Sequence, residues 1–222
     1  NSVKLSLLSS ISALEPFGTD NPQPIFGLFG VKIEEINGMG EGNKHTRLVI
    51  SKNSSRISAL CFNVPDARFP FEKGDSVDLA VNLEKNVFNG EARVSVIVRG
   101  VRPSDTDEIK VLNSINTFNK LTRNEKLNRE QINALIPERN IQVDVFKSVK
   151  NKPLKSAYGE ELCVRLGDSG ENLAKYLTVI DIMLEMGIFS LDDNECLKVS
   201  ENTQKVNIED SEIMKKLRAL QV

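Results

Sequence analysis

Three features of this 222-residue chain carry residue types that can do chemistry, and each falls short of a complete site. His45 is the one histidine, whereas a two-metal hydrolytic centre needs several histidines and aspartates that converge on the ions. The acidic run DDNE (192–195) lacks the spaced ligand series and the glycine of a calcium loop. The glycine-rich stretch GMGEG (38–42) lacks the Gly-Lys-Ser/Thr ending of a phosphate loop, and no helix is expected after it. These patterns predict a structural or surface histidine, a solvated hairpin tip and a flexible loop between two strands.

The cysteines give no sign of a metal cluster or a disulfide framework. Cys61, Cys163 and Cys196 are odd in number, far apart and without a CxxC pair. We therefore expect reduced, partly buried thiols.

The composition limits the kinds of partner. No run of about eighteen apolar residues occurs, so we expect no membrane span and no membrane partner. The chain begins at Asn1 without a basic-then-apolar signal segment, which predicts a piece of a longer, cytoplasmic protein. Up to Asp105 there are 12 basic and 12 acidic residues, and beyond it 17 basic and 19 acidic. Domains that bind DNA by themselves usually carry a net positive charge. Any nucleic-acid site here must therefore be confined to a small basic patch or depend on another domain.

The first half of the chain reads as strands and turns. Strict period-two alternation, clearest at 77–83 and 94–98, indicates strands with one buried and one wet face. The dipeptide Asn89-Gly90 is a hairpin signal. We expect strands at 25–33, 45–50, 56–62, 76–84 and 93–99, and five strands in so short a span predict a small closed barrel, because closure removes exposed edges.

The second half turns helical after the polar, acidic stretch 103–108, which reads as a domain boundary. Ile109, Leu112, Ile115 and Phe118 recur at spacing three and predict a helix over 109–121. Further helices are expected at 128–136, 143–149, 157–166 and 211–220, and a stronger one opens at 169–172 and ends at Gly187. A hairpin with an acidic four-residue turn follows at 188–199. Short helices followed by a hairpin is the order of a winged-helix unit.

Several motifs resemble the OB domain of RecJ-type single-strand-specific DNA exonucleases. The segment LEPFGTDNPQPIF (14–26) is similar to the one that opens that domain, and its prolines and glycine force an extended, turned path. HTRL (45–48), VDLA (77–80), NVFNG (86–90) and VRP (101–103) are also similar. Within the second half, VIDIMLEMG (179–187) through KVNIEDS (205–211) resembles the C-terminal extension of RecJ proteins in low-GC Gram-positive bacteria.

The resemblance implies a mixed β and α chain, with a five-stranded OB-fold barrel followed by a helical winged-helix-like domain. The expected divisions are an N-terminal helix or connector at 1–15, the OB-fold at 16–104, a linker and helix at 105–127, and the winged-helix-like domain at 128–222. It also implies a 5′-to-3′ exonuclease of single-stranded DNA in recombination and repair, with manganese or magnesium in DHH-type catalytic domains. The Asp-His-His triplet is missing here, so no cofactor is expected in this part.

OB-folds bind oligonucleotides on the face of strands two and three and with the loops between strands one and two and strands four and five. Basic residues there would meet phosphates, and Phe62 or Phe88 would stack on a base or else pack against the barrel end or a neighbouring domain. We expect Arg47, Lys85 and Arg93 to form one track. The expected nucleic-acid-binding residues are Lys44, His45, Arg47, Arg56, Phe62, Lys85, Asn86, Phe88, Asn89, Arg93 and Arg99.

Two functions stay open at this point. In the first, the barrel guides single-stranded DNA toward an active site on catalytic domains of the same chain. In the second, the chain is a protein-docking module without DNA contact, and a DNA-repair protein binds through the C-terminal domain. Local basic residues favour the first for the barrel, and the acidic balance favours the second for the tail.

The missing metal ligands lead to a prediction about activity. The isolated chain should not degrade single-stranded DNA, with or without manganese, because one histidine cannot supply a two-metal centre. A 5′-labelled oligonucleotide incubated with the pure protein and resolved on a denaturing gel measures this. Metal-dependent shortening that co-purifies with the protein would contradict it.

Overall fold

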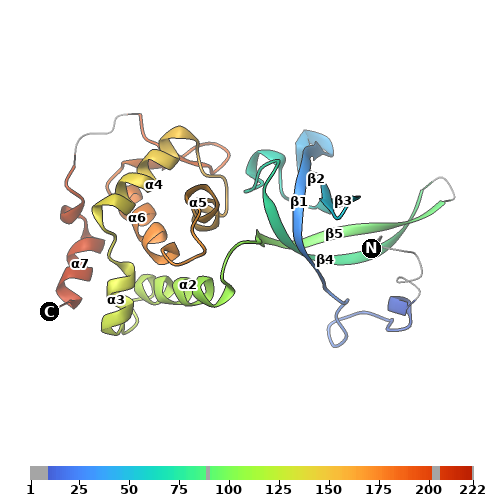
Figure 1. Cartoon of the computed structure of the whole chain (residues 1–222), viewed down its shortest axis with the longest axis horizontal. Coiled ribbons are helices and arrows are strands. Elements are labelled where there is room, and N and C mark those ends of the chain that lie inside the picture. The colour runs from blue at the N-terminus through green and yellow to red at the C-terminus, as the bar shows by residue number, and fades with distance from the viewer. Residues whose placement is uncertain (1–9, 89–90, 202–205, 222) are drawn as a thin grey trace. The chain divides into compact units, whose positions relative to one another are not determined.

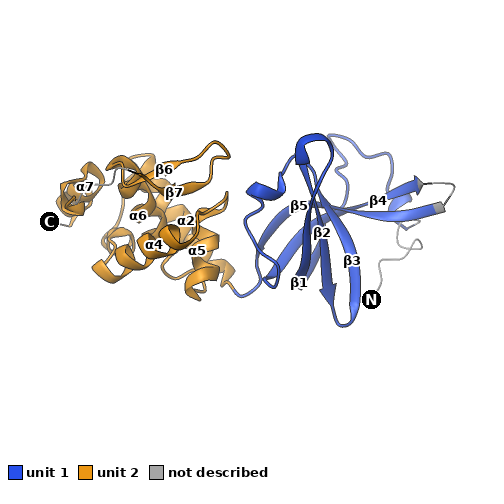
Figure 2. Cartoon of the chain, turned by 90° about the horizontal axis from the view of Figure 1, so that it is seen from above, with its two compact units in different colours: residues 1–105 blue, residues 106–222 orange. Residues whose placement is uncertain are grey.

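The computed structural model describes residues 10–88, 91–201 and 206–221. The chain forms two compact units, Asn1–Asp105 and Thr106–Val222 (Figure 2). Within the described residues, none of the helices has the length and apolar character needed to cross a membrane. The expected linker segment 105–127 contains a helix that packs within the second unit.

The first unit is a closed five-stranded barrel, which confirms the expected fold class (Figure 1). Neighbouring strands follow the order β1-β2-β3-β5-β4, and β4 returns to pair with β1. All pairs are antiparallel except β3 with β5. The strands are β1 (Phe26–Met39), β2 (His45–Lys52), β3 (Ser55–Cys61), β4 (Ser76–Phe88) and β5 (Glu91–Pro103).

β1 is longer than its alternation predicts because it serves two neighbours in turn. Its first half pairs with β4 and its second half with β2. The register slips between Ile33 and Glu35, so Glu34 bulges and the strand bends from one partner to the other. The expected glycine-rich loop therefore shrinks to Gly40–Lys44, which holds the short 3-10 turn η1 (Glu41–Asn43).

The barrel interior is filled as the alternation predicts. Val77, Leu79, Val81 and Leu83 all face inward and are buried. Two fully buried rings, Phe69 and Phe71, come from the segment that follows the 3-10 turn η2 (Asp66–Arg68). Each buried aliphatic or aromatic side chain of this size contributes about 1.5–3 kcal/mol, so this core is the main stabilising term of the unit.

The connector before β1 is held by two asparagine side chains. The Asn21 amide donates to the carbonyl oxygens of Leu14 (2.7 Å) and Pro16 (2.9 Å), which closes the turn. Asn82 on β4 donates to the carbonyl oxygen of Pro24 at 2.8 Å. These bonds satisfy backbone groups that the prolines leave without ladder partners, so the connector has a defined path onto the barrel.

The second unit is built around the helix α6, which is buried on most of its circumference. α6 packs against α2 and α3 on some faces and against α4 and α5 on others. The elements are α2 (Glu108–Thr122), α3 (Arg129–Leu135), α4 (Arg139–Asn151), α5 (Tyr158–Leu166), α6 (Leu173–Glu185), β6 (Phe189–Leu191), β7 (Leu197–Val199), the 3-10 turn η3 (Ile208–Asp210) and α7 (Glu212–Leu220). Gly187 has a φ of 70°, as expected of a residue that ends a helix.

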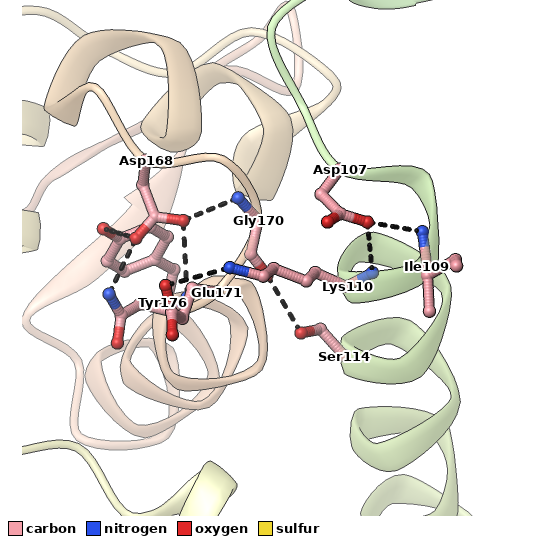
Figure 3. A network of polar contacts seen from close by, with 9 residues as sticks. Asp107, Ile109, Lys110, Ser114, Asp168, Gly170, Glu171 and Tyr176 are labelled. Atoms are coloured by element: carbon pink, nitrogen blue, oxygen red, sulfur yellow. Dashed lines mark hydrogen bonds and ion pairs between the residues drawn. The ribbon is translucent and has the colours of Figure 1, made fainter.

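A polar network joins α2 to the loop before α6 (Figure 3). The Asp168 carboxylate accepts from the Gly170 backbone N–H at 2.7 Å and from the Tyr176 hydroxyl at 3.2 Å. Burial alone would raise the pKa of Asp168, but its hydrogen bonds outweigh this effect and lower the pKa. On the other side, Ser114 of α2 donates to the Gly170 carbonyl oxygen at 3.1 Å. The loop is thereby fixed to both helices.

An ion pair within α5, between the buried Glu161 and the partly exposed Arg165, holds the loop that joins α4 to α5. The Glu161 carboxylate accepts from the backbone N–H groups of Lys155 and Ser156 and lies 3.2 Å from Arg165. Arg165 also donates to the carbonyl oxygens of Lys152 (2.6 Å) and Pro153 (2.9 Å). Burial raises the pKa of Glu161 in spite of these donors.

Replacing Arg165 with methionine should destabilise the second unit. The substitution leaves the buried Glu161 carboxylate without its counter-ion, so we expect the free energy of unfolding to fall by about 3 kcal/mol. Urea denaturation followed by helical circular dichroism measures the change, because the long helices α2 to α7 lie in this unit. Arg129→Met, at an exposed helix start, is the control. Equal stability of the two variants would show that the ion pair is not important.

Candidate nucleic-acid interface

The outward side chains of β2 and β3 form one surface, here called the β2–β3 face. Side chains at directly paired positions share a face. Arg47 therefore lies between Asn37 of β1 and Leu60 of β3, and Val49 lies between Glu35 and Ser58. Leu48 and Ile50 point into the barrel, and Ala59 and Cys61 do the same on β3. The remaining outward residues include His45, Ser51, Arg56 and, just past β3, Phe62.

His45 and Phe62 form an aromatic pair at the end of this face nearest the loop Gly40–Lys44. Their ring centroids are 5.3 Å apart with an interplanar angle of 74°. The backbone N–H of Asn63 donates to His45 Nδ1 at 2.9 Å and fixes the imidazole. Phe62 is still 45% exposed. An exposed aromatic ring packed against a fixed neighbour is the kind of group on which a base stacks.

Two cations close to His45 along the chain have no side-chain partner among the described residues. Lys44 and Arg47 are exposed, and neither makes an ion pair or side-chain hydrogen bond within the described part of the chain. They can contact phosphate without first breaking another contact. In a site of this kind, backbone phosphates supply most of the affinity.

The other end of the β2–β3 face is electrostatically balanced. Arg56 pairs with Glu35 at 3.2 Å, and both side chains are at least half exposed. A hydrogen bond from the Ser51 hydroxyl to Glu34, at 2.6 Å, lowers the pKa of that carboxyl and keeps it charged. The positive character of the face is therefore concentrated at Lys44 and Arg47.

The β4–β5 hairpin extends beyond the rest of the barrel (Figure 1) and presents two different faces. Lys85 pairs with Val94, while Asn86 pairs with Arg93. Paired residues share a face and successive residues alternate, so Lys85 and Arg93 project from opposite faces of the hairpin. The expectation that Arg47, Lys85 and Arg93 form one track is wrong in this respect.

Three candidates remain from the sequence analysis, namely Phe88, Asn89 and Arg99. Arg99 donates to the Asn82 side chain at 2.5 Å and lies 3.9 Å from Glu84, so it is already engaged with β4. Phe88 ends β4, opposite Glu91. Asn89 lies outside the described residues.

The sequence analysis missed two residues of the face on β1. The amide nitrogen of Asn37, beside Arg47, is buried and has no hydrogen-bond partner within the described residues. Met39 lies opposite His45. The sequence analysis ended this strand at residue 33, so both residues lay outside it, and no residue type at 34 signals the bulge beyond which β1 continues.

A family model described as the RecJ OB domain matches residues 1–100. Residues 1–100 are a RecJ-type OB domain. The single-stranded-DNA-specific exonuclease RecJ of Bacillus subtilis (strain 168) is 18% identical over 103 residues, which are 46% of this chain and 13% of that protein. The chain therefore corresponds to a small part of the length of this RecJ protein.

Two crystal structures of RecJ from Thermus thermophilus, in complex with Mn²⁺ and with Mg²⁺, also resemble the chain. Each is 29% identical and covers 43% of this chain, with TM-scores of 0.34 and 0.30. The matched regions span 13% and 14% of the lengths of the two RecJ chains. Scores at this level do not define a shared arrangement, so the fold assignment rests on the barrel topology and the family match.

The described part of this chain does not fit such a metal ion. It contains no group of three or more His, Cys, Asp or Glu side chains placed to hold one. The three cysteines are free and buried, and burial raises the pKa of Cys61 and of Cys163 to about 12, so these two thiols are poor ligands. The features of the RecJ-type OB domain that suit a ligand are its cations and its aromatic pair.

Replacing Arg47 with alanine should weaken binding of single-stranded DNA on any sequence and lower the salt slope by about one unit, because one phosphate contact is lost. Arg56→Ala is the matched variant on the same face. It should have a smaller effect, because Arg56 is paired with Glu35. Fluorescence anisotropy with a labelled oligonucleotide at several salt concentrations measures both.

Asp193→Asn at the acidic hairpin tip of the second unit is the charge control and should leave binding unchanged or slightly stronger. If Arg47→Ala binds DNA normally while substitutions in the second unit abolish binding, the DNA site lies on the second unit. Stability should stay within about 0.5 kcal/mol for all three exposed substitutions.

Proposed function

We propose that this chain is a non-catalytic region of a 5′-to-3′ single-strand-specific exonuclease, in which the OB domain binds single-stranded DNA. The rest of the enzyme, on the same longer chain, would supply the catalytic domains and their manganese or magnesium. Its place would be DNA recombination and repair in the cytoplasm.

The observation that carries the proposal is the arrangement at one end of the β2–β3 face. Lys44 and Arg47, which have no side-chain partner among the described residues, lie close along the chain to His45, and the ring of His45 packs edge-on against the exposed ring of Phe62. This is the surface that OB-folds use for oligonucleotides. A phosphate contact on each side of a stacked base is the general pattern of sequence-tolerant single-strand binding. The matched Bacillus subtilis RecJ, which is named a single-stranded-DNA-specific exonuclease, supports the same function.

The second unit is proposed to be winged-helix-like and to serve as a scaffold rather than a DNA reader. The order α4, α5, α6, β6, β7 supports this, as does the bridge of Leu154 to Leu197, which adds a third extended segment beside the hairpin. The helix before the wing, α6, would be the recognition helix of such a unit. It is buried under α2 and α3 here, and the hairpin tip is acidic. Neither feature suits contact with a polyanion.

A titration of the whole 222-residue chain with a short labelled single strand tests the proposal. Binding should be weak and should fall steeply between low and physiological salt, because most contacts are to phosphates and few phosphates are neutralised. Amide shifts in an ¹⁵N spectrum should concentrate on β2, on β3 and on the loop Gly40–Lys44. Nanomolar affinity that survives molar salt, or no shift on these strands at saturating DNA, would overturn it.

A further inference from the structure

Asn37 of β1 carries a buried polar group that the fold leaves unsatisfied. Its amide nitrogen Nδ2 is buried and has no hydrogen-bond partner within the described residues. Buried polar groups in folded proteins are nearly always paired, because a buried donor without an acceptor costs free energy. The amide of Asn37 is therefore a candidate for a hydrogen bond to a ligand.

Stabilisation of the strand does not explain an asparagine at this position. Asparagine is depleted in β-strands, where β-branched and aromatic residues pack better. Residue 37 lies in the second half of β1, which pairs with β2 in regular register beyond the bulge. A valine or threonine would suit this part of the ladder better. The residue type thus favours a role outside the fold itself.

The register places Asn37 on the candidate nucleic-acid interface. Asn37 lies directly opposite Arg47, and Met39, the next outward residue of β1, lies opposite His45. His45 in turn packs edge-on against Phe62. Side chains at paired positions have Cβ atoms about 4.5–5.5 Å apart, and diagonal neighbours lie roughly 7–8 Å apart. A phosphate at Arg47 and a base edge at Asn37 would therefore belong to the same nucleotide or to adjacent ones.

The side chain opposite the amide is able to move. Arg47 is exposed and makes no ion pair or side-chain hydrogen bond within the described part of the chain. It can turn toward a phosphate without breaking a contact with another side chain. Such a movement would open the space beside the Asn37 amide for a base.

An amide suits the edge of a base better than it suits a phosphate. It carries a donor and an acceptor side by side, whereas a phosphate offers acceptors alone. Each DNA base also has a donor next to an acceptor on its Watson–Crick edge, which is exposed in a single strand. Rotation of the amide by 180° exchanges its two groups, so one asparagine can pair with any of the four bases.

We propose that Asn37 is the base-contacting residue of the β2–β3 face, and that its amide bonds to the edge of a base while Arg47 and Lys44 hold phosphates. The inference rests on the proposed binding of single-stranded DNA by the OB domain and adds which part of the strand is recognised. The ligand is a strand that carries bases, in any sequence, and not a polyanion in general. The bound strand satisfies an amide that the free protein leaves without a partner.

The test compares Asn37→Leu with the parent chain on two labelled oligonucleotides of equal length and charge. One carries thymine at every position and the other is abasic, with tetrahydrofuran in place of each deoxyribose. Leucine resembles asparagine in shape and lacks its polar atoms. We expect Asn37→Leu to bind the thymine strand about fivefold more weakly, because one hydrogen bond is lost, and to bind the abasic strand like the parent. A cytosine strand should show the same loss as the thymine strand.

Two further variants serve as controls. Arg47→Ala should weaken binding of the thymine strand and the abasic strand by the same factor, because the lost contact is to a phosphate. Asn113→Leu makes the same chemical change at an exposed position of α2 and should bind both strands like the parent. Equal loss of both strands by Asn37→Leu, or no loss of the thymine strand, would overturn the assignment of Asn37.

The stability of the barrel gives a second, independent measurement. Asn37→Leu removes an unsatisfied buried group, so the slowest-exchanging amides of β2 and β4 should exchange with solvent as slowly as in the parent, or more slowly. A structural asparagine would give the opposite result. Faster exchange would show that the amide makes a stabilising contact in the free protein, which would overturn the proposal.

The same titrations separate this inference from the proposed function. If the parent binds neither strand, DNA binding by the OB domain fails, and the role of Asn37 fails with it. If the parent binds both strands and Asn37→Leu does the same with unchanged affinities, DNA binding stands and only the base contact is overturned.

Discussion

Closure of the barrel through the short parallel pairing of β3 with β5 is the constraint on which the candidate interface depends. Only two positions pair, Ala59 with Val96 and Leu60 with Ile97. A slip of one residue would exchange the inward and outward side chains of β3, because the side-chain period of a strand is two. The observed register buries Ala59 and leaves Leu60 beside Arg47. The chemistry of the β2–β3 face is therefore a consequence of how the barrel closes.

In the second unit, the position of α6 decides which surfaces remain. Its apolar side chains surround the helix, so neighbours must cover it on several sides. α2 is one of these neighbours, and its Val111, Ile115 and Leu121 face the core while Ile109 is 72% exposed. With α6 covered, the exposed charged side chains of this unit lie on its neighbours, and Arg139, Lys147 and Lys150 of α4 have no ion pair among the described residues. Because α6 is covered, the exposed surface of this unit is offered by α4 and not by α6, the helix that would be the recognition helix of a winged-helix unit.

Features that repeat along the sequence were predictable, and features set by pairing were not. The alternation of Val77, Leu79 and Val81 was enough to predict a strand and its buried face. The spacing of three from Ile109 to Phe118 predicted a helix, but such spacing drifts around the axis at 3.6 residues per turn. This is why Leu112 is exposed. The opposite faces of Lys85 and Arg93 depend on the hairpin register, which no single strand contains.

Net charge was a poor guide to the candidate sites for the same reason. The barrel half of the chain is neutral overall. Arg56 and Arg102 are paired with Glu35 and Asp78, whereas Arg47 has no ion pair among the residues that the structure describes. Contacts between strands decide which cations remain available. The net charge summed over the sequence therefore does not show where the candidate sites are. The number of available cations is more informative than the total.

A small number of available cations suits a binding module that is attached to other domains. Each exposed phosphate contact adds little affinity, so the isolated OB domain would release DNA readily. Within the proposed longer chain, a tether raises the effective concentration of the domain at DNA held elsewhere to the millimolar range. Weak, sequence-tolerant contacts at Lys44, Arg47 and Phe62 would then be enough to guide a strand and still let it move. Tight binding at this face would oppose movement of the strand through the enzyme.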